Sequence, residues 1–194
     1  MPDPTDPTRR SPSRLIVILV TVAIVVTLGA LVTGFVLASR LARQSTAPAT
    51  GPLAVAAAPQ PGASGRYCAE LMPKLPEQLI DQRRRPLIDG QPGVAAWGDP
   101  ATILRCGLPD PAELTCAAQL TRFTGADGAG VEWLRLEESG AVTYLAVDRP
   151  VRIAVTVTAQ AGFGPVQQLS EVIAHALPEQ PVCEAGHVTP TDNS

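Results

Sequence analysis

The densest group of charged side chains in this sequence is the triplet Arg83, Arg84 and Arg85, and the chemistry that it offers is anion binding. A planar guanidinium group pairs with phosphate or carboxylate through two parallel hydrogen bonds. The triplet is therefore a candidate site for a phosphate, a lipid head group or a wall polymer. The alternative is a solvated loop before Pro86, which needs no ligand.

Arg105 is a second candidate for the same anion site, because it is a charged residue within an apolar, strand-like run. It could line a pocket, or it could pair with an acidic residue such as Asp99 or Asp148. Asp148 is itself followed by Arg149 and Pro150, an order that is typical of a turn with a local ion pair. The sequence alone leaves these uses of Arg105 open.

The sequence contains no catalytic, metal-binding or nucleotide-binding motif. It lacks G-x-S-x-G, H-E-x-x-H and a glycine-rich phosphate loop, and basic and aromatic residues do not interleave as on a nucleic-acid surface. His175 and His187 have no zinc-like spacing, and we expect a solvated His175. We therefore expect no catalytic residue, metal, cofactor or nucleic-acid partner. An enzyme would require perturbed carboxylates around His175 or Asp148.

The 24 residues from Leu15 to Ala38 carry no charge and predict one transmembrane helix. As a helix they would measure about 36 Å, enough to cross a hydrocarbon core of about 30 Å. A cleaved signal peptide is the rival, but its apolar region is usually only about 7–15 residues long. We therefore expect an uncleaved signal anchor, with lipid as its first partner.

The four cysteines all follow this apolar span and form no C-x-x-C pair. Four thiols in a small cytosolic domain would be unusual, whereas two disulfides are ordinary outside the cell. The alternative is four free, buried thiols, and three disulfide connectivities are possible. The candidate disulfide residues are Cys68, Cys106, Cys116 and Cys183.

The position of the cysteines also sets the predicted topology. Three Arg precede the span and two follow it, which favours a cytoplasmic N-terminus only weakly, so the cysteines decide the orientation. The expected divisions are a disordered cytoplasmic tail over 1–14, the helix over 15–38, a Pro/Ala-rich linker over 39–65, an extracytoplasmic domain over 66–183 and a flexible tail over 184–194. From residue 66 onward there are 10 Lys plus Arg and 16 Asp plus Glu, a net charge of −6 that repels anionic lipid and nucleic acid.

Hydrophobic periodicity predicts an α+β domain: a small antiparallel sheet of about four to five strands with two helices packed on it. Leu71, Leu75 and Leu79 lie one turn apart and predict a helix broken by prolines, and a loop follows. The run 112–124 fits helix or strand equally well. We expect Trp97 and Trp133 to anchor the core. The other predicted elements are strands at 94–97, 101–106, 131–136, 141–147 and 151–158, and a helix at 165–177.

The blocks YCAEL (67–71), AAWGDPATILRCG (95–107), VEW (131–133), VDRPV (147–151) and LSEVI (169–173) resemble an actinobacterial family of uncharacterised single-span proteins, domain of unknown function 3515. The resemblance covers about residues 66–178 and brings no assigned activity. It implies a domain that faces the cell envelope, with Cys68 and Cys106 as a pair. Cys116 and Cys183 are additions to the pattern and would then pair with each other.

These observations favour a non-enzymatic interaction or accessory module of the cell envelope, tethered to the plasma membrane and in contact with an envelope protein. A short tether raises the local concentration of such a module near its partners. The alternative function is a binder of a small anionic ligand or wall precursor through Arg83, Arg84, Arg85 and Arg105.

Overall fold

The structure of the protein is a computed structural model, and it describes residues 14–44, 51–125, 127–138, 140–158 and 161–192. The chain forms two compact units, Met1–Ala47 and Pro48–Ser194, which are described separately here. The predicted tail over residues 1–14 lies outside the described residues except for its last position.

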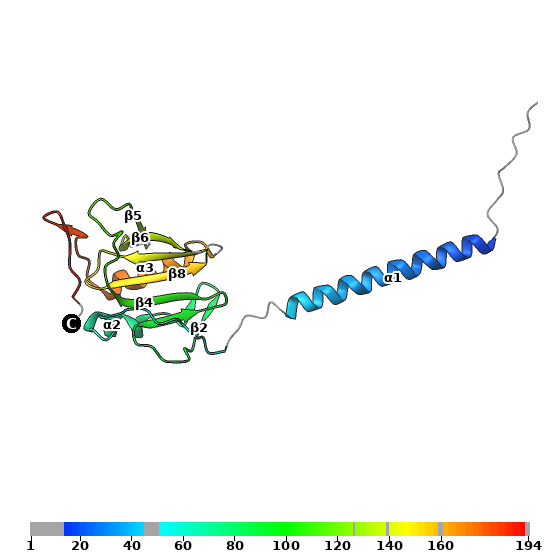
Figure 1. Cartoon of the computed structure of the whole chain (residues 1–194), viewed down its shortest axis with the longest axis horizontal. Helices are drawn as coiled ribbons and strands as arrows, with labels where there is room; N and C mark the ends of the chain where they lie inside the picture. Colours follow the sequence, from blue (N-terminus) through cyan, green and yellow to red (C-terminus); the bar gives the residue numbers. More distant parts are fainter. Residues whose placement is uncertain (1–13, 45–50, 126, 139, 159–160, 193–194) are drawn as a thin grey trace, which may run out of the picture. The chain divides into compact units, whose positions relative to one another are not determined.

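The first unit contains one long helix, α1 (Arg14–Gln44), which includes all of the predicted span. Figure 1 shows α1 as one continuous helix. Its segment Val17–Gly34 has a mean hydropathy of 2.6, and the large apolar side chains described there are exposed. Within the described part of the chain, α1 alone is long and apolar enough to cross a membrane.

The second unit is built on an eight-stranded sheet in the order β1-β2-β3-β4-β8-β7-β6-β5, in which every neighbouring pair is antiparallel (Figure 1). The strands are β1 (Gln78–Leu79), β2 (Gln82–Arg85), β3 (Val94–Trp97), β4 (Thr102–Leu108), β5 (Leu120–Thr124), β6 (Gly130–Glu138), β7 (Ala141–Ala146) and β8 (Arg152–Thr158). The predicted α+β class with an antiparallel sheet is confirmed.

The predicted number of four to five strands is wrong, because β1 and β2 form where a helix end and a loop were expected. β2 has the sequence QRRR, which carries no apolar alternation. Its main chain nevertheless pairs with β3, through Arg84 opposite Trp97 and Arg85 opposite Ala96. Leu79, expected on the broken helix, lies on β1 and is fully buried. The ambiguous run before residue 124 ends in strand β5.

Helices cover one face of the sheet and enclose the main core. They are α2 (Arg66–Leu71), the short 3-10 helix η1 (Met72–Lys74) and α3 (Gly164–Ala176); Figure 1 shows α3 running across the sheet. Trp97 and Trp133 are fully buried in this core, as predicted. The Trp133 indole N–H donates to the Ser170 hydroxyl on α3 at 2.9 Å, which satisfies a buried polar group that the packing creates.

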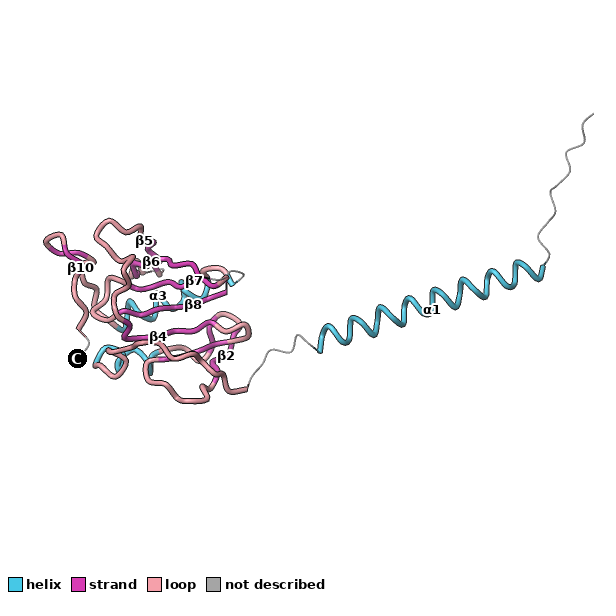
Figure 2. Tube along the Cα trace, viewed as in Figure 1, coloured by secondary structure: helices cyan, strands magenta, loops and turns pink. Residues whose placement is uncertain are grey.

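The opposite face of the sheet, called the outer face here, is partly covered as well. Leu134, Leu145 and Ala154 form a smaller apolar cluster with Leu114, from the loop before β5, and Val188. Val188 belongs to the hairpin of β9 (Cys183–Glu184) and β10 (His187–Val188), which lies at the left of the domain in Figure 2. Arg152 and Ala154 of β8 lie on this outer face, and both are buried.

Two disulfides hold the second unit together. Cys68 on α2 is bonded to Cys106 on β4, and Cys116 is bonded to Cys183 at the start of β9. This is the pairing that the family resemblance implies. The first bond lies in the main core, and the second ties the loop before β5 to the C-terminal hairpin.

The segment predicted as a linker, 39–65, has ordered structure where it is described. Residues 39–44 belong to α1, residues 51–65 contact the sheet, and residues 45–50 lie outside the described part of the chain. Leu53 bridges to Leu87, Val55 is 8% exposed, and the Gly62 N–H donates to the Gly107 carbonyl at 3.0 Å. Gly107 has φ +88°, and a Cβ there would lie 2.3 Å from the Gly62 carbonyl carbon, so only glycine at position 107 admits the turn around Gly62.

The segment predicted as a tail, 184–194, makes main-chain hydrogen bonds to the rest of the domain as far as residue 192. The Thr189 N–H donates to the Val182 carbonyl, and the Asp192 N–H donates to the Pro150 carbonyl. Arg152 donates to the Thr189 carbonyl at 2.8 Å. Amino-acid composition does not predict these contacts, because they are made by main-chain carbonyl groups rather than by apolar side chains.

Candidate functional site

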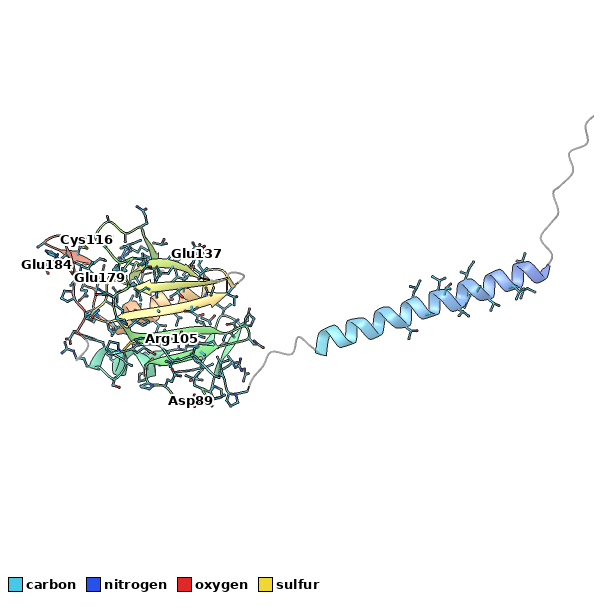
Figure 3. The ribbon with its side chains drawn as sticks, viewed as in Figure 1. Asp89, Arg105, Cys116, Glu137, Glu179 and Glu184 are labelled. Atoms are coloured by element: carbon cyan, nitrogen blue, oxygen red, sulfur yellow. A yellow bond between two sulfur atoms is a disulfide. The ribbon has the colours of Figure 1, made fainter. Side chains whose placement is uncertain are left out.

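The arginines that predicted an anion site make contacts with the chain itself. Arg85 donates to the Gly51 carbonyl at 2.8 and 3.1 Å and to the Gly98 carbonyl at 3.2 Å. Arg105 lies on β4 (Figure 3) and donates to the Ala56 carbonyl at 3.1 Å rather than to an acidic side chain. Burial lowers the pKa of Arg105. Both guanidinium groups thus hold the segment 51–56 against the sheet.

The other two arginines of the triplet point away from each other, because successive side chains on a strand alternate between faces. Arg84 lies 5.9 Å above the Trp97 ring and 3.7 Å from the Glu77 carboxylate. Arg83 is exposed. The structure therefore divides the four candidate arginines between two faces of the sheet and does not gather them around one ligand.

Asp148 and Arg149 form the predicted ion pair, but the pair is buried. Their side chains are each 2% exposed, and Arg149 Nη1 lies 3.0 Å from Asp148 Oδ2. Burial raises the pKa of Asp148, although the charge of Arg149 opposes this shift. Arg149 also donates to the Gly130 carbonyl at 2.6 Å. The pair closes the turn between β7 and β8, which is a structural use.

The candidate binding site is a hollow at α3, next to β1 and β5, which are the two edge strands of the sheet. Its volume is about 330 Å³. It receives Ile80 from the turn between β1 and β2, Thr124 and Gly125 from the end of β5, and its wall is the first two turns of α3. We call it the α3 groove. Its lining residues are Ile80, Thr124, Gly125, Gly164, Gln167, Gln168 and Glu171.

Ile80 is held in the groove in an unfavourable backbone conformation. Its φ is +53°, a region that β-branched residues rarely adopt, yet its side chain is 50% exposed. The Ile80 N–H donates to the Gln168 side-chain oxygen at 2.7 Å, and the Gln168 amide donates to the Gln78 carbonyl at 3.4 Å. The fold thus strains the backbone and still leaves an apolar side chain in water, which is typical of binding sites.

A second exposed apolar side chain, Phe163, stands beside the groove at the start of α3. It is 56% exposed and stacks on Phe123 of β5, with ring centroids 5.7 Å apart and an interplanar angle of 12°. Phe123 in turn meets the buried Tyr144 edge-on at 6.1 Å. The aromatic stack fixes Phe163 in place, so its exposed face is ready for contact without loss of conformational freedom.

The rim of the groove is acidic. Glu171 lies on α3, and the His175 imidazole lies 2.9 Å from the Asp127 carboxylate. The Glu171 carbonyl, and after it the charge of Asp127, raise the pKa of His175. His175 is exposed, as predicted. A second hollow of about 420 Å³ adjoins the groove and shares Glu171 with it.

The groove offers apolar surface, the side-chain amides of Gln167 and Gln168, the hydroxyl group of Thr124 and one carboxylate, that of Glu171. Among the residues that the structure describes, no group of three His, Cys, Asp or Glu side chains could hold a metal ion.

Sequence reasoning missed this groove, because it is assembled from three distant segments. The available signal was weak: an isoleucine in the two-residue turn Ile80-Asp81, where glycine or asparagine is usual, and a phenylalanine directly before α3. Neither residue indicates a site by itself, because the groove exists only when the edge strands β1 and β5 lie beside α3 in the folded domain.

Replacing Ile80 with glycine should raise the free energy of unfolding by about 0.5–1 kcal/mol, because glycine adopts a positive φ without strain. The matched control is Ala185→Gly, since Ala185 has φ +50° in the turn between β9 and β10. Urea unfolding of the full chain in detergent micelles measures the free energy of unfolding of both variants. A loss of stability in Ile80→Gly alone would show that the Ile80 side chain contributes to folding rather than to a surface.

The model of a family described as "Protein of unknown function (DUF3515)" matches residues 20–182 of the chain. No curated protein and no solved structure matches it.

Proposed function

We propose that this chain, which belongs to the DUF3515 family of proteins of unknown function, is a membrane-anchored interaction module whose folded domain binds another protein outside the cytoplasm through the α3 groove. The strained, half-exposed Ile80 beside the stacked Phe163 is the observation that carries the proposal. Two exposed anchors on a rigid support are the usual centre of a protein interface.

Two features support the anchored, extracytoplasmic part of the proposal. α1 has the length and hydropathy of a membrane span, and the described cysteines are all joined in disulfides. Disulfides persist in oxidising compartments and are rare in the cytosol. A domain on such an anchor searches for partners only within a short distance of the membrane, which raises their effective concentration.

Co-purification from the native host tests the groove. The full, membrane-anchored chain is compared with the double variant Ile80→Ser/Phe163→Ser, and partners are quantified by mass spectrometry. We expect at least about tenfold lower recovery of an envelope protein, because the contact area of two apolar anchors is lost. The matched control is Ile88→Ser, since Ile88 is 61% exposed on the loop after β2 and lies outside the groove lining.

The outcome is decisive in both directions. If the double variant no longer recovers the envelope protein and Ile88→Ser still does, the result supports a partner at the groove. Equal recovery with all three proteins, or equal loss with both variants, would contradict it. Thermal unfolding of each purified variant shows whether the fold is intact.

A further inference from the structure

One edge of the sheet next to the groove has no neighbouring strand among the residues that the structure describes. β5 is the last strand in the sheet order, and its partner there is β6. Thr121, Arg122 and Thr124 are exposed. An edge strand of this kind presents unpaired N–H and C=O groups that can template another strand.

The hydrogen-bond register identifies which groups are unpaired. The Gly125 N–H bonds to the Ala129 carbonyl, and the Val147 N–H bonds to the Glu132 carbonyl. Because hydrogen-bonded and non-hydrogen-bonded pairs alternate, Thr121 and Phe123 direct their main-chain groups toward β6. The main-chain groups of alternate residues therefore point away from the sheet: Leu120, Arg122 and Thr124.

We propose that β5 accepts an extended segment of another protein as a ninth strand, with the side chains of that segment resting against Phe163 and the α3 groove. The inference rests on the proposed function and specifies its binding mode. Thr124 joins the two features, because it lines the groove and also presents an outward N–H at the sheet edge. Main-chain bonds to the edge give affinity, and pockets for alternate side chains give specificity.

The charges around β5 indicate the chemistry of the segment. Arg122 is already paired with Glu179 at 3.1 Å and Glu132 at 3.4 Å, and His175 is paired with Asp127. The Glu171 carboxylate has no ion-pair partner among the described residues. Acidic side chains thus outnumber basic ones along this edge. They favour an extended segment that places an apolar residue against Phe163 and a Lys or Arg beside the Glu171 carboxylate.

A second copy of this chain fits the same edge poorly. If two β5 strands paired around a two-fold axis with all three outward residues engaged, Arg122 would lie opposite Arg122 of the other copy. Like charges directly opposite each other destabilise a strand pair. The edge therefore favours a different polypeptide over self-association.

Selection from a random-peptide phage library against the full chain in detergent micelles tests this mode. We expect enriched peptides that alternate apolar and polar residues and carry Lys or Arg. Thr124→Pro should weaken them at least about tenfold, because proline removes the outward N–H and spares the bonds to β6. Thr124→Val keeps that N–H and most of the side-chain shape, and it should bind like the wild type.

A second measurement keeps the test valid if Thr124→Pro fails to fold. An enriched peptide is N-methylated at alternate amides: methylation of the set that faces β5 should abolish binding, and methylation of the other set should leave it unchanged. Equal binding to Thr124→Pro and Thr124→Val, no enrichment, or dimers of the chain that Thr124→Pro dissociates would each overturn the proposal. If Ile80→Ser/Phe163→Ser loses its partner while Thr124→Pro keeps it, strand addition fails and the groove proposal stands.

Discussion

Replacing Arg152 with alanine is expected to lower the free energy of unfolding by about 3–5 kcal/mol, because three carbonyl groups in buried or partly buried positions lose their charged donor. Arg152 is 0% exposed. Its Nε donates to Asp110 at 2.6 Å, and its other nitrogens donate to the carbonyls of Val147, Arg149 and Thr189. One guanidinium group thus joins the turn after β7, the loop after β4 and the C-terminal segment.

Urea unfolding followed by the fluorescence of the buried tryptophans measures this loss, and hydrogen exchange shows whether the C-terminal segment opens. Arg135→Ala is the matched control, since Arg135 also lies on a strand but is 48% exposed beside Glu137. Exposed ion pairs contribute little, so this variant should change stability by less than about 1 kcal/mol. Equal effects of the two variants would contradict the structural role assigned to Arg152.

Replacing Cys68 and Cys106 together with alanine should cost about 4 kcal/mol, because their disulfide closes a loop with a sequence separation of 38 residues. The bond constrains the unfolded chain. Because both cysteines are fully buried in the main core, it also fills space between α2 and β4. The loss is large for a domain of this size, whose total stability is typically about 5–15 kcal/mol.

The second disulfide provides the comparison. Cys116 and Cys183 are separated by 67 residues, so the chain-entropy estimate is again about 4 kcal/mol. Because this bond ties a surface loop to the C-terminal hairpin, its removal should open that region locally and cost less global stability. Alkylation of the non-reduced wild-type protein comes first: we expect no labelled thiol, and four labelled thiols would contradict both bonds.

The sequence predicted those elements whose residues alternate or repeat with a clear period. The uncharged span from Leu15 to Ala38 lies within α1, and the strand predicted at 151–158 and the helix predicted at 165–177 appear within one residue of their predicted limits. Each carries its own apolar pattern, which can be read from the local sequence before the distant residues that pack against it are known.

The elements that were missed form through main-chain contacts with distant partners. β2 reads QRRR and becomes a strand only because β3 pairs with it. The segment 51–65 carries Pro and Ala, yet Gly62 bonds to Gly107 and Arg105 bonds to Ala56. The α3 groove was missed for the same reason, since β1 and β5 meet at α3 only after the whole sheet has formed.

In-cell photocross-linking tests the central claim most directly. A photoreactive residue at Gln167, which is exposed in the groove lining, is compared with one at Asp89, which is exposed on the loop after β2. Both are placed in the full, membrane-anchored chain in the native host. The account predicts one envelope protein cross-linked at Gln167 and absent at Asp89. The same products at both positions, or a cytoplasmic protein cross-linked at Gln167, would contradict it.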